Sequence, residues 1–346
     1  MQSIAVAGHI CLDISPLLAD HARIAPGSLV EVGPLSVTLG GSVANTGRAL
    51  TGLGAQVVPY ATVGDDELGS LLLSKLAAEG FTSPQLSISP SLSTSYSVVI
   101  EQTGVDRTFW HHTGANAHFD GSVVNSADHS LLHVGYPPLL PGLLENKGRA
   151  LHDLFARARS EGVTTSVDLA VVDPHSAVGA LDWEAILSAI FAHSDVATPS
   201  LDDLTSALGI DEPYSLDLVN RLADRMLDQG VAVVAISAGQ HGLHLRTAST
   251  ERLSAGGRIL APLSKSWANQ ELTVPPLQVT HAATTNGAGD ASTAGLLYGL
   301  TIGATPEESA ALAVACSAVV MSGKPISPDN VTQLDSGLSS IFNAHP

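Results

Sequence analysis

The chain has 346 residues, of which 45% are hydrophobic and 14% charged, so it is long enough and apolar enough to bury a large core. Its formal net charge of −18, from 33 acidic and 15 basic residues, argues against nucleic acid or an anionic membrane as a partner, because both require a basic surface. The two cysteines, Cys11 and Cys316, do not make a disulfide framework, so we expect buried thiols in a reducing, cytoplasmic compartment.

The N-terminal residues give no sign of targeting. The first ten lack the basic and small-residue pattern of a secretory leader, and no run of about 18 apolar residues occurs anywhere in the chain. The sequence therefore predicts a soluble chain that is not processed and does not enter a membrane.

Apolar patterning in the first half of the chain alternates between strands and helices. Short apolar runs predict strands at 4–8 and 57–63, and helical spacing predicts helices at 42–53 and 66–80. Two β-rich stretches fall outside this alternation: a hairpin at 29–38 with a Gly33-Pro34 turn, and a second pair at 94–101 and 107–110 around Gly104. We expect both to belong to a small separate β element, carried by segments 11–39 and 92–116.

The second half continues the alternation. Strands are expected at 131–135, 164–168, 195–199 and 231–237, helices at 143–161, 182–193, 291–300 and 310–321, and a loose hairpin or loop at 246–270. This pattern predicts one α/β domain over 1–346, with a doubly wound, mostly parallel sheet whose ligands bind at the carboxyl ends of the strands. Asp168 ends one such strand, and we interpret it as either a site residue or a structural acid.

The most informative stretch is TTNGAGD at residues 284–290, where a glycine-rich loop opens into an apolar helix. Helix N-termini present unpaired N–H groups and partial positive charge, and glycine lets the backbone approach a ligand closely. This pattern predicts an anion site at Gly287, Ala288 and Gly289. A carboxylate beside an anion would repel it unless the carboxylate carries chemistry, so we interpret Asp290 as a general base. The alternative is a first-turn acid favoured by the helix dipole, with glycines that form only a turn.

Residues 39–45 (LGGSVAN), 63–69 (VGDDELG) and 285–290 together resemble motifs of the ribokinase (PfkB-type) carbohydrate kinase family, in the family's order and over nearly the whole chain. The resemblance implies a ribokinase-like fold with a small β-sheet lid formed by the two inserted segments. It implies ATP-dependent phosphorylation of a primary hydroxyl on a sugar or sugar-like substrate, with Mg²⁺ and a monovalent cation as cofactors. Because exposed sheet edges often pair, we also expect a homodimer through the lid.

The resemblance also assigns roles to individual residues. Asp290 would be the base, and the amides of Gly287, Ala288 and Gly289 would bind the transferred phosphoryl group. The sugar would be bound by Asp13, Gly40, Gly41, Asn45, Arg107 and Asn116, the nucleotide by Ser200, Ser237, Gly239, Gly242, Thr285 and Asn286, and the metal by Asp203. Carboxylates and amides suit a polyol because they match the donors and acceptors of neighbouring hydroxyls.

Two positions depart from the family's pattern. Thr284 stands where the family usually has aspartate, and Ser200 and Asp203 stand in place of its Asn-x-x-Glu motif. Aspartate keeps the charge of glutamate but not its reach, so we expect altered metal handling at Asp203 and a differently tied loop at Thr284.

Three other functions fit parts of the sequence. A nucleoside kinase of the same family and a non-catalytic sugar or nucleotide sensor would share these motifs. The lid residues expected to distinguish a ribose, a hexose and a nucleoside, Arg107, Trp110 and His112, carry no readable code. A dinucleotide-dependent oxidoreductase is disfavoured, because the third glycine of its G-x-G-x-x-G motif is replaced by Ser292.

Overall fold

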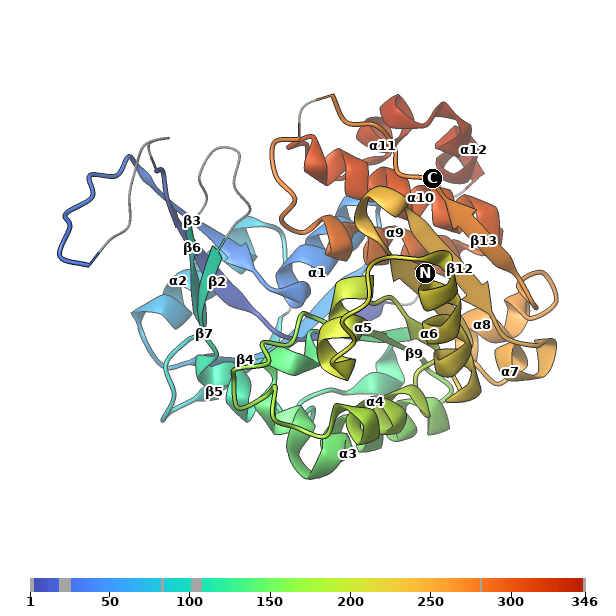
Figure 1. Ribbon diagram of the computed structural model, residues 1–346, viewed down its shortest axis with the longest axis horizontal. Helices are drawn as coiled ribbons and strands as arrows, with labels where there is room; N and C mark the ends of the chain where they lie inside the picture. Colours follow the sequence, from blue (N-terminus) through green and yellow to red (C-terminus); the bar gives the residue numbers. More distant parts are fainter. Residues whose placement is uncertain (1–2, 19–25, 82–83, 101–107, 281, 345–346) are drawn as a thin grey trace.

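The main body of the protein is a large sheet covered by helices (Figure 1). The computed structural model describes residues 3–18, 26–81, 84–100, 108–280 and 282–344. The sheet strands are β1 (Ile4–Gly8), β4 (Val57–Gly64), β5 (Gln85–Ser89), β8 (Leu131–Gly135), β9 (Thr164–Asp168), β10 (Val196–Ala197), β11 (Val233–Ser237), β12 (Leu243–Thr247) and β13 (Glu271–Val274). Their order across the sheet is β13-β12-β11-β10-β9-β8-β1-β4-β5, and only the β11–β12 and β12–β13 pairs are antiparallel.

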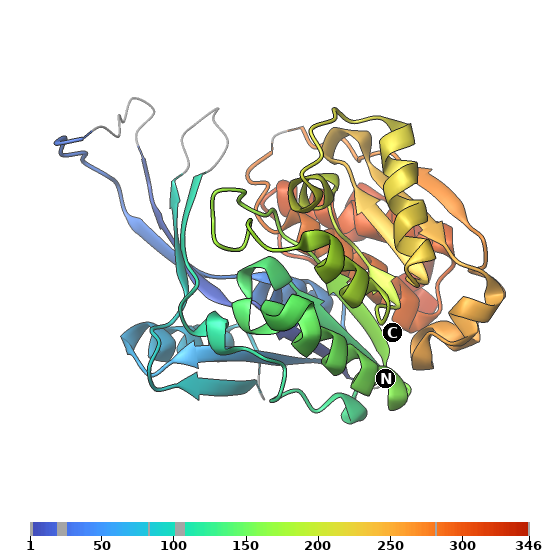
Figure 2. The same cartoon turned by 60° about the horizontal axis from the view of Figure 1, so that its bottom comes forward.

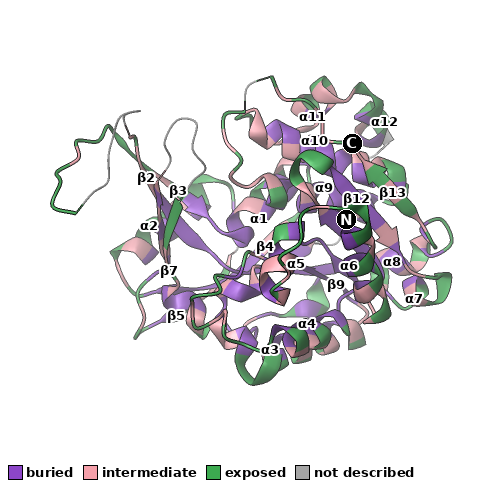
Figure 3. Ribbon diagram, in the orientation of Figure 1, coloured by how far each residue is buried: buried purple, intermediate pink, exposed green. Residues whose placement is uncertain are grey.

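Helices cover both faces of this sheet, as the sequence predicted. They are α1 (Ser42–Gly52), α2 (Glu67–Ala78), α3 (Pro141–Ser160), α4 (Trp183–Phe191), α5 (Leu201–Leu208), α6 (Leu216–Asp228), α7 (Thr250–Ser254), α8 (Gly257–Leu263), α9 (Ala288–Ile302), α10 (Pro306–Met321), α11 (Pro328–Leu334) and α12 (Ser339–Ala344). Alternate residues of β1 enter different cores: Ile4 and Val6 pack with α1, α9 and α10, and Ala5 and Ala7 with α3, α4 and α6. Figure 3 shows the buried strands between helices whose outer sides are exposed.

A second sheet projects from one side of the main body (Figures 1 and 2). Its strands are β2 (Cys11–Pro16), β3 (Leu35–Gly40), β6 (Tyr96–Ile100) and β7 (Thr108–His112), in the order β3-β2-β6-β7. The β6–β7 pair is antiparallel, as the sequence predicted, whereas β2 and β6 run parallel. These strands come from the two stretches that lie outside the strand-helix alternation.

The hairpin expected within residues 29–38 is wrong. Strand β3 pairs instead with β2, in a register that sets Leu39 opposite Leu12. Both leucines are buried in this pairing, whereas Leu29 on the expected partner segment is 99% exposed. Burial of apolar area therefore selects a partner more than twenty positions away over the adjacent segment.

The loose loop expected at 246–270 is also wrong, because α7 and α8 lie within it. The hydroxyl of Ser249 accepts the N–H of Arg252 and caps α7. Leu253 of α7, Leu260 of α8 and Trp267 after α8 are all fully buried in one core cluster with residues of α9 and α10. Polar residues surround these three positions in the sequence and hide them.

Helix α9, which follows the glycine-rich stretch, packs very closely against α10. A Cβ on Gly295 would lie 2.8 Å from the backbone of Ala313, and one on Gly299 would lie 2.5 Å from the hydroxyl oxygen of Ser309. Only glycine permits this approach, so the contact fixes the position of α9. Helix α10 begins with a capping box between Thr305 and Glu308.

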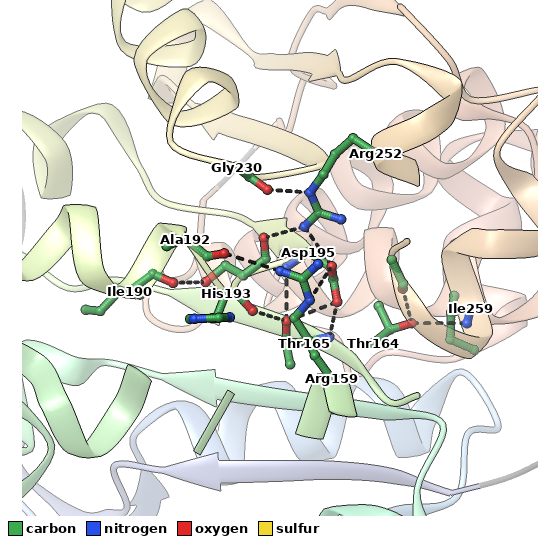
Figure 4. Close-up of polar contacts among 12 residues, drawn as sticks. Arg159, Thr164, Thr165, Ile190, Ala192, His193, Asp195, Gly230, Arg252 and Ile259 are labelled. Carbon is green, nitrogen blue, oxygen red and sulfur yellow. Dashed lines mark hydrogen bonds and ion pairs between the residues drawn. The ribbon is translucent and has the colours of Figure 1, made fainter. Parts of the chain in front are cut away.

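A buried ion-pair cluster ties the main sheet together at the start of β10 (Figure 4). The Asp195 carboxylate is fully buried and accepts the N–H and the hydroxyl of Thr165, at 2.9 and 3.1 Å. Its other oxygen accepts from Arg252 at 2.7 Å and lies 3.6 Å from a guanidinium nitrogen of Arg159. The cluster joins α3, β9 and α7 at the edge of the sheet opposite the carboxyl ends of the strands.

No helix in the described part of the chain is long and apolar enough to cross a bilayer.

Candidate active site

A cleft of about 960 Å³ lies at the carboxyl ends of the parallel strands, between the main body and the second sheet. His9, Tyr136 and Asp168 line it directly after or at the ends of β1, β8 and β9. Ser97 and His111 line it from the second sheet. In a doubly wound sheet this edge is where ligands bind, so the cleft is the candidate active site.

Asp290 lies in the first turn of α9 at the centre of the cleft lining, and it is 1% exposed. One carboxylate oxygen, Oδ2, accepts from Tyr136 Oη at 2.7 Å and from Asn45 Nδ2 at 3.1 Å. The other oxygen, Oδ1, accepts from Thr46 Oγ1 at 3.0 Å. Three donors, one directly after β8 and two from α1, thus hold one orientation of the carboxylate.

The surroundings act on the pKa of Asp290 in opposite directions. Burial raises this pKa above its usual value, while the hydrogen bonds from Tyr136, Asn45 and Thr46 and the charge of Arg48 lower it. The net shift is upward. A carboxylate of raised pKa is a stronger base than an exposed aspartate.

A chain of contacts connects Asn45 to the surface. The side-chain oxygen of Asn45 accepts from Arg48 at 3.1 Å, which turns the amide nitrogen toward Asp290. Arg48 is held in turn by both carboxylate oxygens of Glu79, at 2.7 and 3.0 Å. This bidentate pair fixes which end of the Asn45 amide faces the carboxylate.

Tyr136 was not among the residues predicted from the sequence. Its backbone is left-handed, with φ 62° and ψ 49°, a conformation that a bulky residue rarely adopts. The following Pro137 disfavours the right-handed helical region for the residue before it. The sequence signal that could have identified Tyr136 is its position, directly after a buried strand whose end lies at the cleft.

The glycine-rich stretch forms the predicted loop and helix start. Gly287 is the N-cap of α9 in the left-handed region, with φ 76°, and a Cβ on Gly289 would meet nothing within 4 Å. Both glycines line the cleft. The N–H of Ala288 donates to the carbonyl of Thr285 at 3.3 Å. The Thr284 hydroxyl accepts the N–H of Asn286 at 3.0 Å, so threonine ties down this loop where the family usually has aspartate.

Asp13 lies on β2 close to this loop. Its carboxylate accepts from Asn286 Nδ2 and from the Cys11 thiol, each at 3.4 Å. A Cβ on Gly40 would come within 2.5 Å of that carboxylate, so Gly40 leaves the space that Asp13 occupies. The pair places the predicted acid beside Asn286 and Gly287, which line the same cleft.

The residues predicted to bind the nucleotide and the metal fall into two groups. Ser200, Ser237, Thr285 and Asn286 line the cleft, as does Asp203. Gly239 and Gly242 belong to the turn between β11 and β12 and are not among the lining residues. At Gly242 a Cβ would lie 2.1 Å from the carbonyl oxygen of Val274, so this glycine is required by packing.

Asp203 and Asp168 are buried carboxylates on this side of the cleft. The Asp203 side chain accepts the N–H of Ser200 at 2.8 Å, forming a capping box at the start of α5. Burial raises the pKa of Asp203 to about 6. Burial and the charges of Asp203 and Asp290 raise the pKa of Asp168 well above its usual value. Among the described residues, no three acidic, histidine or cysteine side chains are close enough to hold a metal ion unaided.

The remaining predicted substrate residues lie elsewhere. The side-chain oxygen of Asn116 accepts the N–H of Ile10 at 3.4 Å and its nitrogen donates to the Ile10 carbonyl at 2.9 Å, so the side chain braces the link between β1 and β2, and Asn116 is not among the lining residues. Phe109 and His111 line the cleft, whereas Trp110 and His112 do not. Trp110 and His112 point to the opposite face because side chains alternate along a strand. Arg107 lies outside the described residues.

The comparisons with known proteins agree with this arrangement. The sequence pattern of the pfkB family carbohydrate kinases matches residues 1–329. The chain is 30% identical over 168 residues to a 1-phosphofructokinase from Rhodobacter capsulatus, covering 49% of this chain and 42% of that protein. It is 27% identical over 207 residues to a 2-dehydro-3-deoxygluconokinase from Thermoproteus tenax, covering 57% and 61%. The match thus spans less than two thirds of either relative.

The fold is similar to that of a solved Arabidopsis thaliana ribokinase in complex with ribose and ATP, with a TM-score of 0.71 and 15% identity over 96% of this chain and 98% of that one. This likeness concerns the fold alone. The family pattern covers almost the whole chain. The protein therefore belongs to the pfkB family of carbohydrate kinases.

Proposed function

We propose that the protein transfers the γ-phosphoryl group of ATP to a primary hydroxyl of a sugar or sugar-like acceptor, with Asp290 as the general base. The observation that carries this proposal is the placement of Asp290. It is a buried carboxylate at the N-terminus of α9, directly after a glycine-rich loop, in a cleft that also holds Asp13. Membership of a carbohydrate kinase family supports the same reaction class.

Asp290 retains acceptor capacity for the proton it would take. A carboxylate can accept about four hydrogen bonds, and Asp290 accepts three, of which only one reaches Oδ1. The acceptor hydroxyl would give its proton to Asp290 as its oxygen attacks the γ-phosphorus. The bond from that phosphorus to the β-phosphate oxygen breaks, and ADP leaves with the electron pair.

The charge that spreads over the transferred phosphoryl group would be bound by the start of α9. The amides of Gly287 and Gly289 and the helix dipole provide partial positive charge there without a charged side chain, and the Ala288 amide would exchange its 3.3 Å bond to the Thr285 carbonyl for one to the phosphoryl group. Small residues in this turn allow the phosphoryl group to approach the backbone closely.

Asp203 and Asp168 fit a magnesium ion carried in with the nucleotide. Burial is the main reason that the pKa of each carboxyl group is raised, and the charges of Asp203 and Asp290 raise that of Asp168 further, so a divalent cation beside them would offset the cost of ionising them. With fewer than three acidic, histidine or cysteine ligands together among the described residues, the ion would be held mainly by water and the phosphates, and Asp203 would be its protein ligand. When bound there, Mg²⁺ would neutralise part of the negative charge of the phosphates.

The second sheet would act as a lid. Ser97 and His111 from β6 and β7 line the cleft, so the sheet lies against the acceptor and would exclude water during transfer. Strands β3 and β7 are its edges, and pairing of such edges is the basis for the proposed homodimer.

The proposal is tested by measuring ADP formation from Mg-ATP over a panel of pentoses, hexoses, sugar acids and nucleosides. The Asp290→Asn variant is assayed in parallel. Acceptor-dependent ADP formation that is lost in the variant supports the proposed reaction. Tight binding of sugar or ATP without turnover on any class would instead support a non-catalytic sensor.

A further inference from the structure

The VGDDELG stretch at residues 63–69 lies away from the chemistry of the cleft, although it is one of the three stretches that resemble the family. None of its seven residues is among those that line the cleft. The stretch contains the end of β4, the N-cap of α2 and the first residues of that helix. It contacts Thr94, which lies between β5 of the main sheet and β6 of the second sheet (Figure 1). The stretch can therefore act on the site only through another part of the chain.

Three hydrogen bonds hold Thr94 to this stretch. The Asp66 carboxylate accepts the N–H of Thr94 at 2.8 Å with one oxygen and its hydroxyl at 2.6 Å with the other. The same hydroxyl accepts the N–H of Gly64 at 3.0 Å. Asp66 also accepts the N–H of Gly69 at 2.8 Å, which caps α2. We name the three bonds to Thr94 the Asp66 clamp, and it joins the start of α2 to the root of β6.

The carboxylate of the clamp is ionised near pH 7. Burial by itself would raise the pKa of Asp66, but the hydrogen bonds from Thr94 and Gly69 hold it below its usual value. Hydrogen bonds to an ionised acceptor are about twice as strong as those between neutral groups. The clamp is thus a strong local contact on Thr94, which is 1% exposed.

The two glycines of the stretch leave the space that the clamp occupies. A Cβ on Gly64 would lie 2.5 Å from the backbone nitrogen of Thr94. One on Gly69 would lie 2.3 Å from the carbonyl oxygen of Gly64 and 2.9 Å from the Thr94 hydroxyl oxygen. Interiors are close-packed, so a larger residue at either position would move Thr94. Both glycines and the aspartate of this stretch therefore serve the same neighbour.

The clamp holds the second sheet at a point that the apolar core does not secure. Strands β2 and β3 contribute the buried Leu12 and Leu39 to a core cluster that includes residues of α1 and α2. All five residues of β6 are described, and Tyr96 alone among them packs against that cluster. Hydrogen bonds at Thr94 thus hold the root of β6, whereas apolar burial holds the roots of β2 and β3.

The residue after Thr94 connects β6 to both of its neighbours. The carbonyl of Ser95 accepts the N–H of Leu12 in β2 at 3.1 Å. The hydroxyl of Ser95 donates to the carbonyl of His112, the last residue of β7, at 2.8 Å. A displacement of Thr94 would therefore be passed on to β2 and β7 as well as to β6.

A small tilt at Thr94 is enough to disturb the cleft. Ser97 lines the cleft three residues beyond Thr94, and it pairs with Asp13 of β2 and His111 of β7, which also line it. Three residues of extended strand span about 10 Å, so a tilt of about 6° at Thr94 moves Ser97 by about 1 Å. A misplacement of about 1 Å can lower a rate by about 100-fold.

We propose that Asp66 is a positioning residue for the acceptor end of the site, and that it acts through Thr94 and β6 on the cleft-lining residues of the second sheet. This inference rests on the proposed kinase function. Without the clamp the second sheet would tilt more freely over the cleft. The acceptor would then bind more weakly, and water would reach the γ-phosphate in place of the acceptor hydroxyl.

Asp66→Ser separates this role from the capping of α2. Serine is a good N-cap, so it can still accept the N–H of Gly69, but it cannot also accept both donors of Thr94. Thr94→Val removes the hydroxyl and keeps the shape, and Thr94→Ser restores the hydroxyl. Ser215→Ala removes the N-cap of α6, none of whose residues lines the cleft, and is the control for a loss of stability alone.

The first measurements are KM for an acceptor that is phosphorylated, KM for ATP, and the ratio of ADP formed to acceptor phosphorylated. Asp66→Ser and Thr94→Val should raise KM for the acceptor about tenfold, which corresponds to a second sheet in its competent position about one tenth of the time. Both should raise the ratio above that of wild type and change KM for ATP little. Thr94→Ser should behave as wild type.

Ser215→Ala should lower the thermal midpoint of unfolding without changing the acceptor KM or the ratio. If Asp66→Ser changes only the thermal midpoint, as this control does, the inference is overturned. Should Asp66→Ser fail to fold, Thr94→Val and Thr94→Ser provide the same comparison.

Hydrogen exchange of backbone amides tests the clamp without any reaction. In Asp66→Ser and Thr94→Val, the amides of β6 should exchange about tenfold faster than in wild type, while those of β9 change little. Ser215→Ala should leave the exchange of β6 unchanged. Faster exchange of β6 in a protein that forms no ADP with any acceptor would contradict the kinase function and still support the clamp. Exchange of β6 at the wild-type rate in both variants would contradict the clamp, whatever the activity.

Discussion

The Tyr136 hydroxyl donates to the Asp290 carboxylate at 2.7 Å from a left-handed backbone with φ 62°. The two residues are 154 positions apart: Tyr136 directly follows β8, and Asp290 lies in α9. A strained conformation persists only where its surroundings hold it, and here the strain positions a donor on the proposed base. Tyr136 is thus expected to set the basicity and the orientation of Asp290.

Replacing Tyr136 with phenylalanine should move the acid limb of the pH profile of kcat/KM to higher pH. The hydroxyl lowers the pKa of Asp290 by bonding its ionised form, so its loss raises that pKa. Asp290 can act as a base only when it is ionised. A higher pKa therefore means that kcat/KM begins to fall at a higher pH when the solution is made more acidic. The shift should be about 1 to 2 pH units, because a hydrogen bond to a charged group contributes about 1.5 to 3 kcal/mol. An unmoved limb would contradict this role.

The Asp290→Asn variant tests the base itself. Turnover should fall by about 10²- to 10⁴-fold, the usual contribution of a general base, because the amide cannot accept the proton. The fold should survive, since asparagine has the same shape as aspartate. The measurements are kcat from ADP release and the thermal midpoint of unfolding. Turnover within a few-fold of wild type would exclude Asp290 as the base.

Arg48→Met should affect catalysis more than stability. The Arg48–Glu79 ion pair is partly exposed, with side chains 44% and 29% accessible, so its loss should cost at most about 1 kcal/mol of unfolding free energy. Without Arg48 the Asn45 amide is free to turn its oxygen toward Asp290, which would repel the carboxylate. We expect kcat to fall by about tenfold, roughly one lost or inverted hydrogen bond. Glu79→Gln is the variant matched to Arg48→Met, and we expect it to lower kcat in the same way but by a smaller factor.

Asp195→Ala should lower the free energy of unfolding by about 3 to 5 kcal/mol, because it leaves Arg252 without its buried counter-charge. Urea unfolding of the single variants and of the Asp195→Ala, Arg252→Met double variant measures this. The double variant should lose less than the sum of the two single variants, because it no longer holds an Arg252 without its partner, and only Arg159 is left without Asp195. Because the cluster lies away from the cleft, KM for ATP should not change.

Asp203→Asn should change how stability depends on pH. The pKa of Asp203 in the folded protein, about 6, is above its usual value, so its favourable contribution is present at low pH and is lost as pH rises through about 6. The asparagine variant does not ionise, so between pH 4 and pH 8 its thermal midpoint should gain on that of wild type. Mg²⁺ added at pH 8 should stabilise wild type more than the variant. Equal responses to Mg²⁺ would contradict a metal role for Asp203.

The sequence was sufficient for features that depend on neighbouring residues. Alternating strand and helix patterns predicted the doubly wound sheet. Helices cover both faces of the sheet, so both faces of β1 are buried and the strand is a continuous apolar run that can be recognised locally. The turn at Gly287 and the helix after it were predictable, because a glycine at positive φ and an apolar run act locally. The Thr305 capping box was predictable for the same reason.

Only the tertiary structure decided which distant residues meet. The partners of Asp290 lie more than 150 positions away, and the pairing of β3 with β2 follows from burial of Leu12 and Leu39. Strand periodicity separates Trp110 and His112 from Phe109 and His111, but which pair faces the cleft depends on how the second sheet packs. The buried His9 ring, neither of whose nitrogens has a hydrogen-bond partner among the described residues, is placed by packing alone. Local chemistry therefore determined the elements and the glycine loop of this protein, and long-range burial determined the donors and histidines of its site.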